Sequence, residues 1–242
     1  MLAARGRMAP TDAAVVTRDQ GALLFDFNGV LVDDEDHHCE ALRAVLREQG
    51  IELTREQYYA EYLGFDDRMC FVDALRRAHR TPLAEQVSHL IAAKSQIYET
   101  LISRNLALVP GVREFVMRAA GGFRLAIVSG ALRREIDLVL EQSGLRRHFT
   151  VIVAAEDVSL CKPDPEGYLA AHAGLERAGP LTRRRCVVFE DSLPGLEAAQ
   201  AAGMRCVALS TSHPAPALRV ADLVWPSFQG HDPTELLPLL NS

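Results

Sequence analysis

The chain has 242 residues with a formal net charge of -6 at pH 7; 48% of its residues are hydrophobic and 24% are charged. This balance is ordinary for a globular protein and excludes a wholly disordered chain. The negative net charge argues against a nucleic-acid-binding surface, which needs clustered Lys and Arg, and no apolar run is long enough to span a membrane.

Two features of the sequence predict a cytoplasmic protein. Residues 1–20 contain three arginines but lack an apolar segment, so we interpret them as a disordered N-terminal extension rather than a targeting peptide. The cysteines are scattered at Cys39, Cys70, Cys161, Cys186 and Cys206. They form no paired motif, which predicts free thiols in a reducing compartment and neither a disulfide framework nor a zinc site.

The first apolar run, residues 22–26, predicts a buried strand that ends on Asp26. The carboxyl ends of strands are where an open α/β sheet binds its ligands. Asn28 and Gly29 follow, and a glycine allows a tight turn directly after such a strand. On its own the pattern is more typical of a carboxylate that caps a turn or a helix, so the later segments decide between the two interpretations.

Residues 37–107 show helical periodicity and no convincing strand. Their apolar faces are formed by Leu42, Val45 and Leu46, by Phe71, Leu75 and Ala78, and by Leu90, Ile97 and Leu101. Because an insertion of this size must bury a core of its own, we predict a helical cap domain over residues 37–107.

Five further apolar runs alternate with helical patterns: residues 125–129, 151–154, 186–190, 206–210 and 223–225. They are short and continuously apolar, as are parallel strands that are buried on both faces. One intervening helix ends at Gly144, and another begins at Pro194 and ends at Gly203. Residues 21–36 and 108–242 are therefore predicted to form an α/β core with a Rossmann-like, doubly wound parallel sheet.

Four short segments follow these strands in a fixed order: Asp26-Phe27-Asn28, Val128-Ser129-Gly130, Cys161-Lys162-Pro163-Asp164-Pro165 and Val188-Phe189-Glu190-Asp191-Ser192. Together they resemble the motifs of the haloacid dehalogenase-like superfamily of phosphohydrolases. The helical-cap subfamily that contains β-phosphoglucomutase and phosphoglycolate phosphatase is most similar, over about residues 22–228. Asn28 departs from the pattern, because most members carry a second Asp there.

The resemblance implies a role for each motif. Asp26 is the nucleophile that forms an aspartyl-phosphate, Ser129 and Gly130 hold the phosphoryl oxygens, and Lys162 neutralises the shared charge. It also implies a Mg²⁺ site with hard oxygen ligands. The implied metal residues are Asp26, the backbone carbonyl of Asn28, Asp191, and Glu190, which holds a metal-bound water. Without the other motifs, Glu190 and Asp191 would simply cap the next helix.

The resemblance also places substrate-binding residues around the cap. His38 lies at the hinge into the cap, Gly64 in a loop that sets specificity, and Lys94 on a substrate-contacting helix, while Arg133 would bind the remote end of the substrate. Each has a plain alternative. The acidic run before His38 fits a solvated linker or a helix N-terminus, and Lys94 and Arg133 fit ordinary basic residues on solvated helices.

The sequence thus predicts a Mg²⁺-dependent phosphomonoester hydrolase of a small phosphorylated metabolite, such as a sugar phosphate. We expect a monomer or weak homodimer that binds no nucleic acid and no membrane. A phosphomutase is one alternative, although Leu63 and Asp67 stand where the mutase pattern has Lys and Arg. A catalytically attenuated phosphate-binding regulator is another, because in the family the Asp at position 28 is the acid/base group. Dehalogenation fits less well, since it needs no metal ligands.

Overall fold

A computed structural model describes residues 20–241, so the predicted extension of residues 1–20 lies, except for Gln20, outside the described residues. Six parallel strands form one sheet in the order β3-β2-β1-β4-β5-β6. All six predicted strands are confirmed, with no bound displaced by more than one residue. They are β1 (Ala22–Phe25), β2 (Arg124–Val128), β3 (Val151–Val153), β4 (Cys186–Glu190), β5 (Arg205–Leu209) and β6 (Leu223–Trp225).

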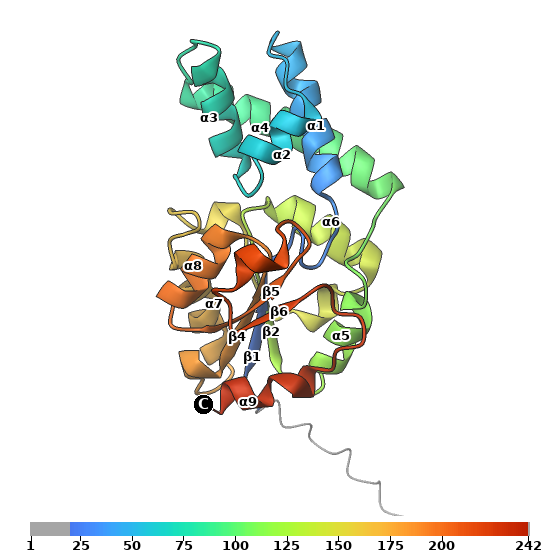
Figure 1. Ribbon diagram of the computed structural model, residues 1–242, viewed down its shortest axis with the longest axis vertical. Helices are drawn as coiled ribbons and strands as arrows, with labels where there is room; N and C mark the ends of the chain where they lie inside the picture. The colour runs from blue at the N-terminus through green and yellow to red at the C-terminus, as the bar shows by residue number, and fades with distance from the viewer. Residues whose placement is uncertain (1–19, 242) are drawn as a thin grey trace, which may run out of the picture.

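Helices cover both faces of this sheet (Figure 1). Because side chains alternate along a strand, each strand contributes to two separate apolar layers. One layer packs against α5 (Val112–Ala119), α6 (Arg133–Ser143) and α9 (Leu237–Leu240). The other packs against α7 (Glu166–Glu176) and α8 (Leu193–Ala201). The predicted doubly wound α/β core is therefore confirmed.

The centre of the sheet fixes the two strand ends that carry acidic residues. Phe25 pairs in register with Phe189 on the neighbouring strand, and their rings stack with centroids 4.8 Å apart. Both side chains are fully buried. Asp26 and Glu190 come directly after these two rings, so they leave the sheet side by side at its carboxyl edge.

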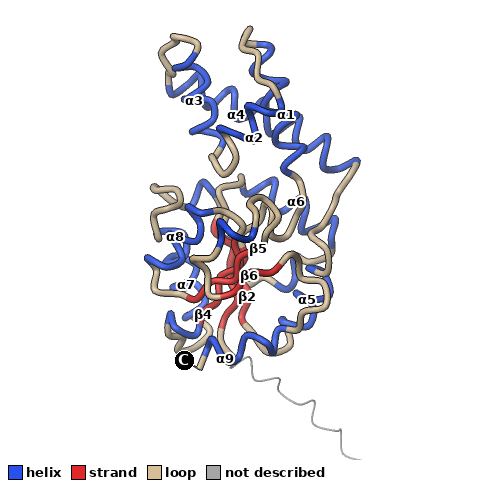
Figure 2. Tube along the Cα trace, viewed as in Figure 1, coloured by secondary structure: helices blue, strands red, loops and turns tan. Residues whose placement is uncertain are grey.

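Four helices between β1 and α5 lie together beyond the carboxyl edge of the sheet, in a part of the chain where Figure 2 shows no strand. They bury a separate apolar cluster of their own. This helical layer, called the cap below, consists of α1 (Glu35–Glu48), α2 (Arg55–Glu61), α3 (Asp67–Arg77) and α4 (Ala84–Arg104). The first helix begins two residues before the predicted boundary, because the acidic residues Glu35 and Asp36 suit its first turn.

Local sequence signals set the end of α6 and the start of α8. Gly144 ends α6 with a φ of 70°, and the Ser192 side chain accepts a hydrogen bond from Gly195 N at the start of α8. No helix within residues 20–241 combines the length and the apolar character needed to cross a membrane. Short 3₁₀ helices cover Arg146–His148, Ala155–Asp157, Arg183–Arg185, Ala215–Leu218 and Pro233–Leu236.

Candidate active site

A cavity of ≈ 250 Å³ lies between the cap and the carboxyl edge of the sheet. Such a crevice beyond the strand ends is the usual ligand site of an open α/β sheet. The sequence-predicted residues that line it are Asp26, Asn28, His38, Gly64, Lys94, Ser129, Gly130, Lys162 and Asp191. Glu190 is fully buried directly beside them. Of the predicted set, only Arg133 is not brought to this region.

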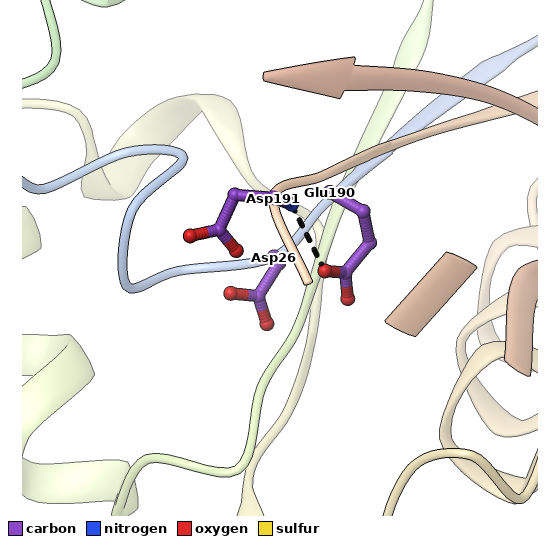
Figure 3. A group of neighbouring side chains, drawn as sticks. All are labelled: Asp26, Glu190 and Asp191. Atoms are coloured by element: carbon purple, nitrogen blue, oxygen red, sulfur yellow. Dashed lines mark hydrogen bonds between the residues drawn. The ribbon is translucent and has the colours of Figure 1, made fainter. Parts of the chain in front are cut away.

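Three buried carboxylates lie close together where β1 and β4 end (Figure 3). Asp26, Glu190 and Asp191 each offer an oxygen within 4.8 Å of the others. Burial, followed by the charges of Glu190 and Asp26, raises the pKa of Asp191 well above its ordinary value. The turn after β1 must pass very close to this group, since a Cβ on Gly29 would lie 2.0 Å from Asp191 Oδ2. Only glycine fits there.

Lys162 supplies the positive charge inside this cluster. Its Nζ donates to Asp26 Oδ1 and to Glu190 Oε1, at 2.5 Å each, and to the Val128 carbonyl at 3.2 Å. Burial alone would lower the pKa of Lys162, but Asp26 and Glu190 raise it above its ordinary value. Burial also raises the pKa of Asp26 to about 7, although Lys162 opposes this. The ammonium is therefore what keeps the Asp26 carboxylate available as an anion.

Glu190 is fully engaged with the protein. Oε1 accepts from Lys162 and from the Tyr168 hydroxyl at 2.7 Å, and Oε2 accepts from the Ser192 hydroxyl and from two backbone amides. Burial opposes its ionisation, yet Lys162 and the other donors bring the pKa of Glu190 below its ordinary value. Glu190 thus orients Lys162. Tyr168 was missed by the sequence analysis, because a tyrosine inside an amphipathic helix carries no pattern of its own.

The negative charge of the carboxylate cluster is only partly compensated by the protein, and a divalent cation would compensate the rest. Three buried acidic groups share one ammonium, and Asp191 Oδ1 accepts no hydrogen bond from residues 20–241. The Asn28 carbonyl likewise has no hydrogen-bond donor among the described residues. Hard oxygen ligands of this kind suit Mg²⁺. An acidic cluster that can hold a metal is present.

Two donors face the cavity after β2. The Ser129 N–H bonds the Val153 carbonyl, and Ser129 Oγ accepts from the Ala131 N–H at 3.0 Å. The Ser129 hydroxyl hydrogen and the Gly130 N–H have no acceptor in the described part of the chain. Both are therefore free to donate to the oxygens of an anion.

Asn28 is tied to the first turns of the cap. Its amide donates to Asp34 Oδ2 at 2.8 Å and lies 2.9 Å from His38 Nε2. Asp34 is buried, accepts from the Tyr98 hydroxyl as well, and lies 3.3 Å from His38 Nε2. The side chain at position 28 is therefore held by a carboxylate and an imidazole. The sequence analysis did not single out Asp34, because it lies within a run of acidic residues.

Lys94 is only 2% exposed, so the alternative of a solvated lysine is wrong. Its ammonium donates to Asp67 and lies 2.5 Å from His38 Nδ1. Lys94 and Lys162 are the only two lysines in the chain, where every other basic side chain is arginine or histidine. Both line this cavity, so the compact ammonium, rather than the planar guanidinium, is the cation of the site.

Arg133 lies outside the cavity. Its side chain is paired with Asp157 and donates to the Ile152 carbonyl at 2.8 Å, while its N–H bonds Glu156. These bonds tie the start of α6 to the segment after β3. The structure therefore favours the plain alternative of an ordinary basic residue in the first turn of a helix, and we assign Arg133 no contact with substrate.

Comparison with known proteins gives consistent matches. A family model described as haloacid dehalogenase-like hydrolase matches residues 23–209. The chain is 34% identical over 200 residues to Protein CbbY of Rhodobacter capsulatus, covering 77% of this chain and 83% of that protein. It is 30% identical over 207 residues to validoxylamine A 7'-phosphate phosphatase of Streptomyces hygroscopicus subsp. limoneus, covering 83% and 91% respectively. Two longer Arabidopsis thaliana relatives are matched over only 19% and 52% of their own length.

The fold is shared with a solved relative. The crystal structure of CbbY from Rhodobacter sphaeroides in complex with xylulose-(1,5)bisphosphate superimposes with a TM-score of 0.78 at 28% identity, covering 87% of this chain and 95% of that one. A family model that spans most of the chain, together with a superposition of nearly full length, leaves the family in no doubt.

Proposed function

The chain belongs to the haloacid dehalogenase-like hydrolase family, and from this we propose that it hydrolyses the phosphate monoester of a small metabolite in a Mg²⁺-dependent reaction. One observation carries the proposal. The buried carboxylate of Asp26 lines the cavity and accepts a hydrogen bond from the ammonium of Lys162, and the free donors of Ser129 and Gly130 line the same cavity. Relatives are named as phosphatases of validoxylamine A 7'-phosphate and of hexitols, which supports a sugar phosphate or a similar compound as substrate.

The reaction we propose has two steps. Asp26 attacks phosphorus, a new carboxylate–phosphorus bond forms, and the bond from phosphorus to the leaving oxygen breaks. Water then attacks phosphorus and releases inorganic phosphate, which regenerates the Asp26 carboxylate. Ser129 and Gly130 hold the phosphoryl oxygens, and Lys162 offsets the charge that Asp26 and the phosphoryl group share. Asp26 alone forms a bond to phosphorus in this proposal, and the other residues contribute to the rate by positioning the phosphoryl group and stabilising its charge.

Mg²⁺ would be held by Asp26, Asp191 and the Asn28 carbonyl, and when bound it would reduce the repulsion between the carboxylates and the phosphate. Glu190 stays with Lys162 and contributes by fixing the ammonium. Asp191 Oδ2 accepts from the Ser212 hydroxyl, and its Oδ1 has no hydrogen-bond donor among the described residues.

Asp191→Asn is expected to raise the Mg²⁺ concentration for half-maximal activity by at least about tenfold, because a charged ligand oxygen is lost. Titration of p-nitrophenyl phosphate hydrolysis with Mg²⁺ measures this. Asp137→Asn, which removes a half-buried carboxylate that is paired with Arg146 outside the cavity, is the matched control and should leave the titration unchanged. An identical Mg²⁺ titration for Asp191→Asn and wild type would place the metal elsewhere.

The amide of Asn28 cannot transfer a proton, so the leaving oxygen must be protonated by another group. His38 lines the cavity and contacts Asn28, and Asp34 holds both. We propose that His38, oriented by Asp34, takes the acid/base role that the family gives to the residue at position 28. This arrangement favours an active enzyme over an attenuated phosphate-binding regulator.

Asn28→Asp alone is expected to lower turnover and melting temperature, because the new carboxylate would face Asp34 Oδ2, which the amide now contacts at 2.8 Å. The double variant Asn28→Asp/Asp34→Asn exchanges the amide and the carboxylate between the two positions, so that a donor again faces an acceptor. It should recover the melting temperature and exceed the single variant in turnover of an alkyl phosphate by at least about tenfold. The four proteins of this cycle are compared by kcat and thermal unfolding. If Asn28→Asp alone surpasses both wild type and the double variant, positions 28 and 34 act independently.

Three further expectations remain proposals. The cap, residues 37–107, would close over the substrate and exclude bulk water. The protein would act in the cytoplasm as a monomer or weak homodimer. A phosphomutase is not favoured, because that activity needs a cap cation for a second phosphate, and Lys94 is already paired with Asp67.

A further inference from the structure

The walls of the cavity carry many more acidic than basic side chains. Its only Lys or Arg lining residues are Lys94 and Lys162, and Lys162 belongs to the phosphate end. Besides Asp26 and Asp191, the acidic lining residues are Glu35, Asp66, Asp67, Glu135 and Asp164. The part of the substrate that projects away from the phosphate therefore meets five carboxylates, against one ammonium and the imidazole of His38, which is itself paired with Asp34.

The charge of that ammonium is already compensated. Lys94 is buried, donates to Asp67, and has Glu135 as its next acidic neighbour. Glu135 in turn accepts from the Ser95 hydroxyl at 2.5 Å, which joins α4 of the cap to α6 of the core. The carboxylates of Asp67 and Glu135 therefore compensate the charge of Lys94, which offers no spare positive charge to a ligand.

The other acidic side chains lack cationic partners. Glu35 accepts from the Tyr58 hydroxyl at 2.5 Å, and burial raises the pKa of Glu35 above its ordinary value. Asp66 and Asp164 accept from backbone N–H groups at helix starts. Among residues 20–241, no Lys or Arg forms an ion pair with any of these three. Arg68 lies on the same helix as Asp67, but it is exposed and does not line the cavity.

A second anionic group on the substrate would thus enter a space in which acidic side chains outnumber basic ones, and their negative charge repels it. We propose that the enzyme selects monophosphates whose alcohol part is uncharged or carries an amino group, and that it discriminates against bisphosphates and phosphorylated carboxylic acids. The inference rests on the proposed phosphatase function. The proposed preference for monophosphates would distinguish this chain from the relative whose crystal structure contains xylulose-(1,5)bisphosphate.

A charge series on one sugar frame tests the proposal. All three compounds carry the phosphate on C6: glucosamine 6-phosphate replaces one hydroxyl of glucose 6-phosphate by an ammonium, and 6-phosphogluconate is the open-chain acid, which adds a carboxylate. Each is used as a competitive inhibitor of p-nitrophenyl phosphate hydrolysis, so that its inhibition constant is measured whether or not it is turned over. We expect 6-phosphogluconate to bind at least about tenfold more weakly than glucose 6-phosphate, and glucosamine 6-phosphate to bind as tightly as glucose 6-phosphate or more tightly. Fructose 1,6-bisphosphate should likewise bind more weakly than fructose 6-phosphate.

A variant then assigns the effect to the Lys94 pair. Asp67→Asn frees the charge of Lys94 and should narrow the gap between 6-phosphogluconate and glucose 6-phosphate by about tenfold. Asp73→Asn, on the same helix but outside the cavity and paired with Arg77, should leave the gap unchanged. Equal inhibition constants across the series, or tightest binding of 6-phosphogluconate, would overturn the proposal. Absence of any p-nitrophenyl phosphate hydrolysis would instead refute the phosphatase function itself.

Discussion

Asp26→Asn is expected to reduce turnover by on the order of 10⁴-fold or more, because it removes the nucleophile and leaves a neutral amide in its place. The change is almost isosteric, and the amide oxygen can still accept from Lys162, which now bonds Asp26 Oδ1 at 2.5 Å. Ground-state binding of phosphate should therefore survive. Steady-state hydrolysis of p-nitrophenyl phosphate and of a sugar phosphate, together with the inhibition constant of inorganic phosphate, separates these two effects.

The stability of this variant provides the control. Burial raises the pKa of Asp26 from 3.8 to about 7, so above about pH 4 the ionised carboxylate is less favourable in the folded protein than in the unfolded one. Without a divalent cation, Asp26→Asn should therefore melt at or above the temperature of wild type at pH 8, and the difference should vanish near pH 4. Activity within a few-fold of wild type in a correctly folded variant would remove Asp26 as the nucleophile.

Lys162→Met is expected to cost both activity and stability. It leaves Asp26, Glu190 and Asp191 buried together without their ammonium, and breaking a buried ion pair in this way typically costs about 3–5 kcal/mol. Turnover should fall by on the order of 10³-fold, because the charge of the transferring phosphoryl group is no longer offset. Thermal unfolding and p-nitrophenyl phosphate hydrolysis measure the two losses.

Lys94→Met is the matched control, since it makes the same substitution at the only other lysine of the chain. On p-nitrophenyl phosphate, which has little to contact in the cap, its loss of turnover should be much smaller. Adding Mg²⁺ should raise the melting temperature of Lys162→Met more than that of wild type, because the metal then supplies the missing positive charge. Equal losses of activity in the two lysine variants would contradict the assignment of Lys162 as the residue that offsets the charge of the phosphoryl group.

The sheet was predictable from the sequence because its strands are buried on both faces. Short, continuously apolar runs such as Cys186–Glu190 are typical of internal strands, and the carboxyl ends of parallel strands share one edge of the sheet. These strand ends, together with the resemblance to the family motifs, predict that Asp26, Ser129 and Asp191 lie near one another. The helical cap followed from apolar spacing, and Gly29 from the tight turn after β1.

The contacts made between distant segments were not predictable. Asp34 is buried while its neighbours Asp33 and Asp36 are exposed, because only position 34 faces the Tyr98 hydroxyl across α1 and α4. Lys94 looked like a solvated lysine for the same reason: its partner Asp67 lies on another helix. Spacing along one helix shows which face is apolar, but it does not show which polar groups two packed helices bring together.

Mapping the phosphoryl group on the enzyme during turnover tests the central claim most directly. Wild-type protein is mixed with a phosphomonoester and Mg²⁺, quenched in acid within the first turnover, digested, and analysed by peptide mass spectrometry. We predict one phosphoryl group per enzyme molecule on Asp26, with none in the Asp26→Asn variant. A phosphoryl group on any other residue, or complete hydrolysis during a single turnover without labelling of Asp26 at any time point, would contradict this account.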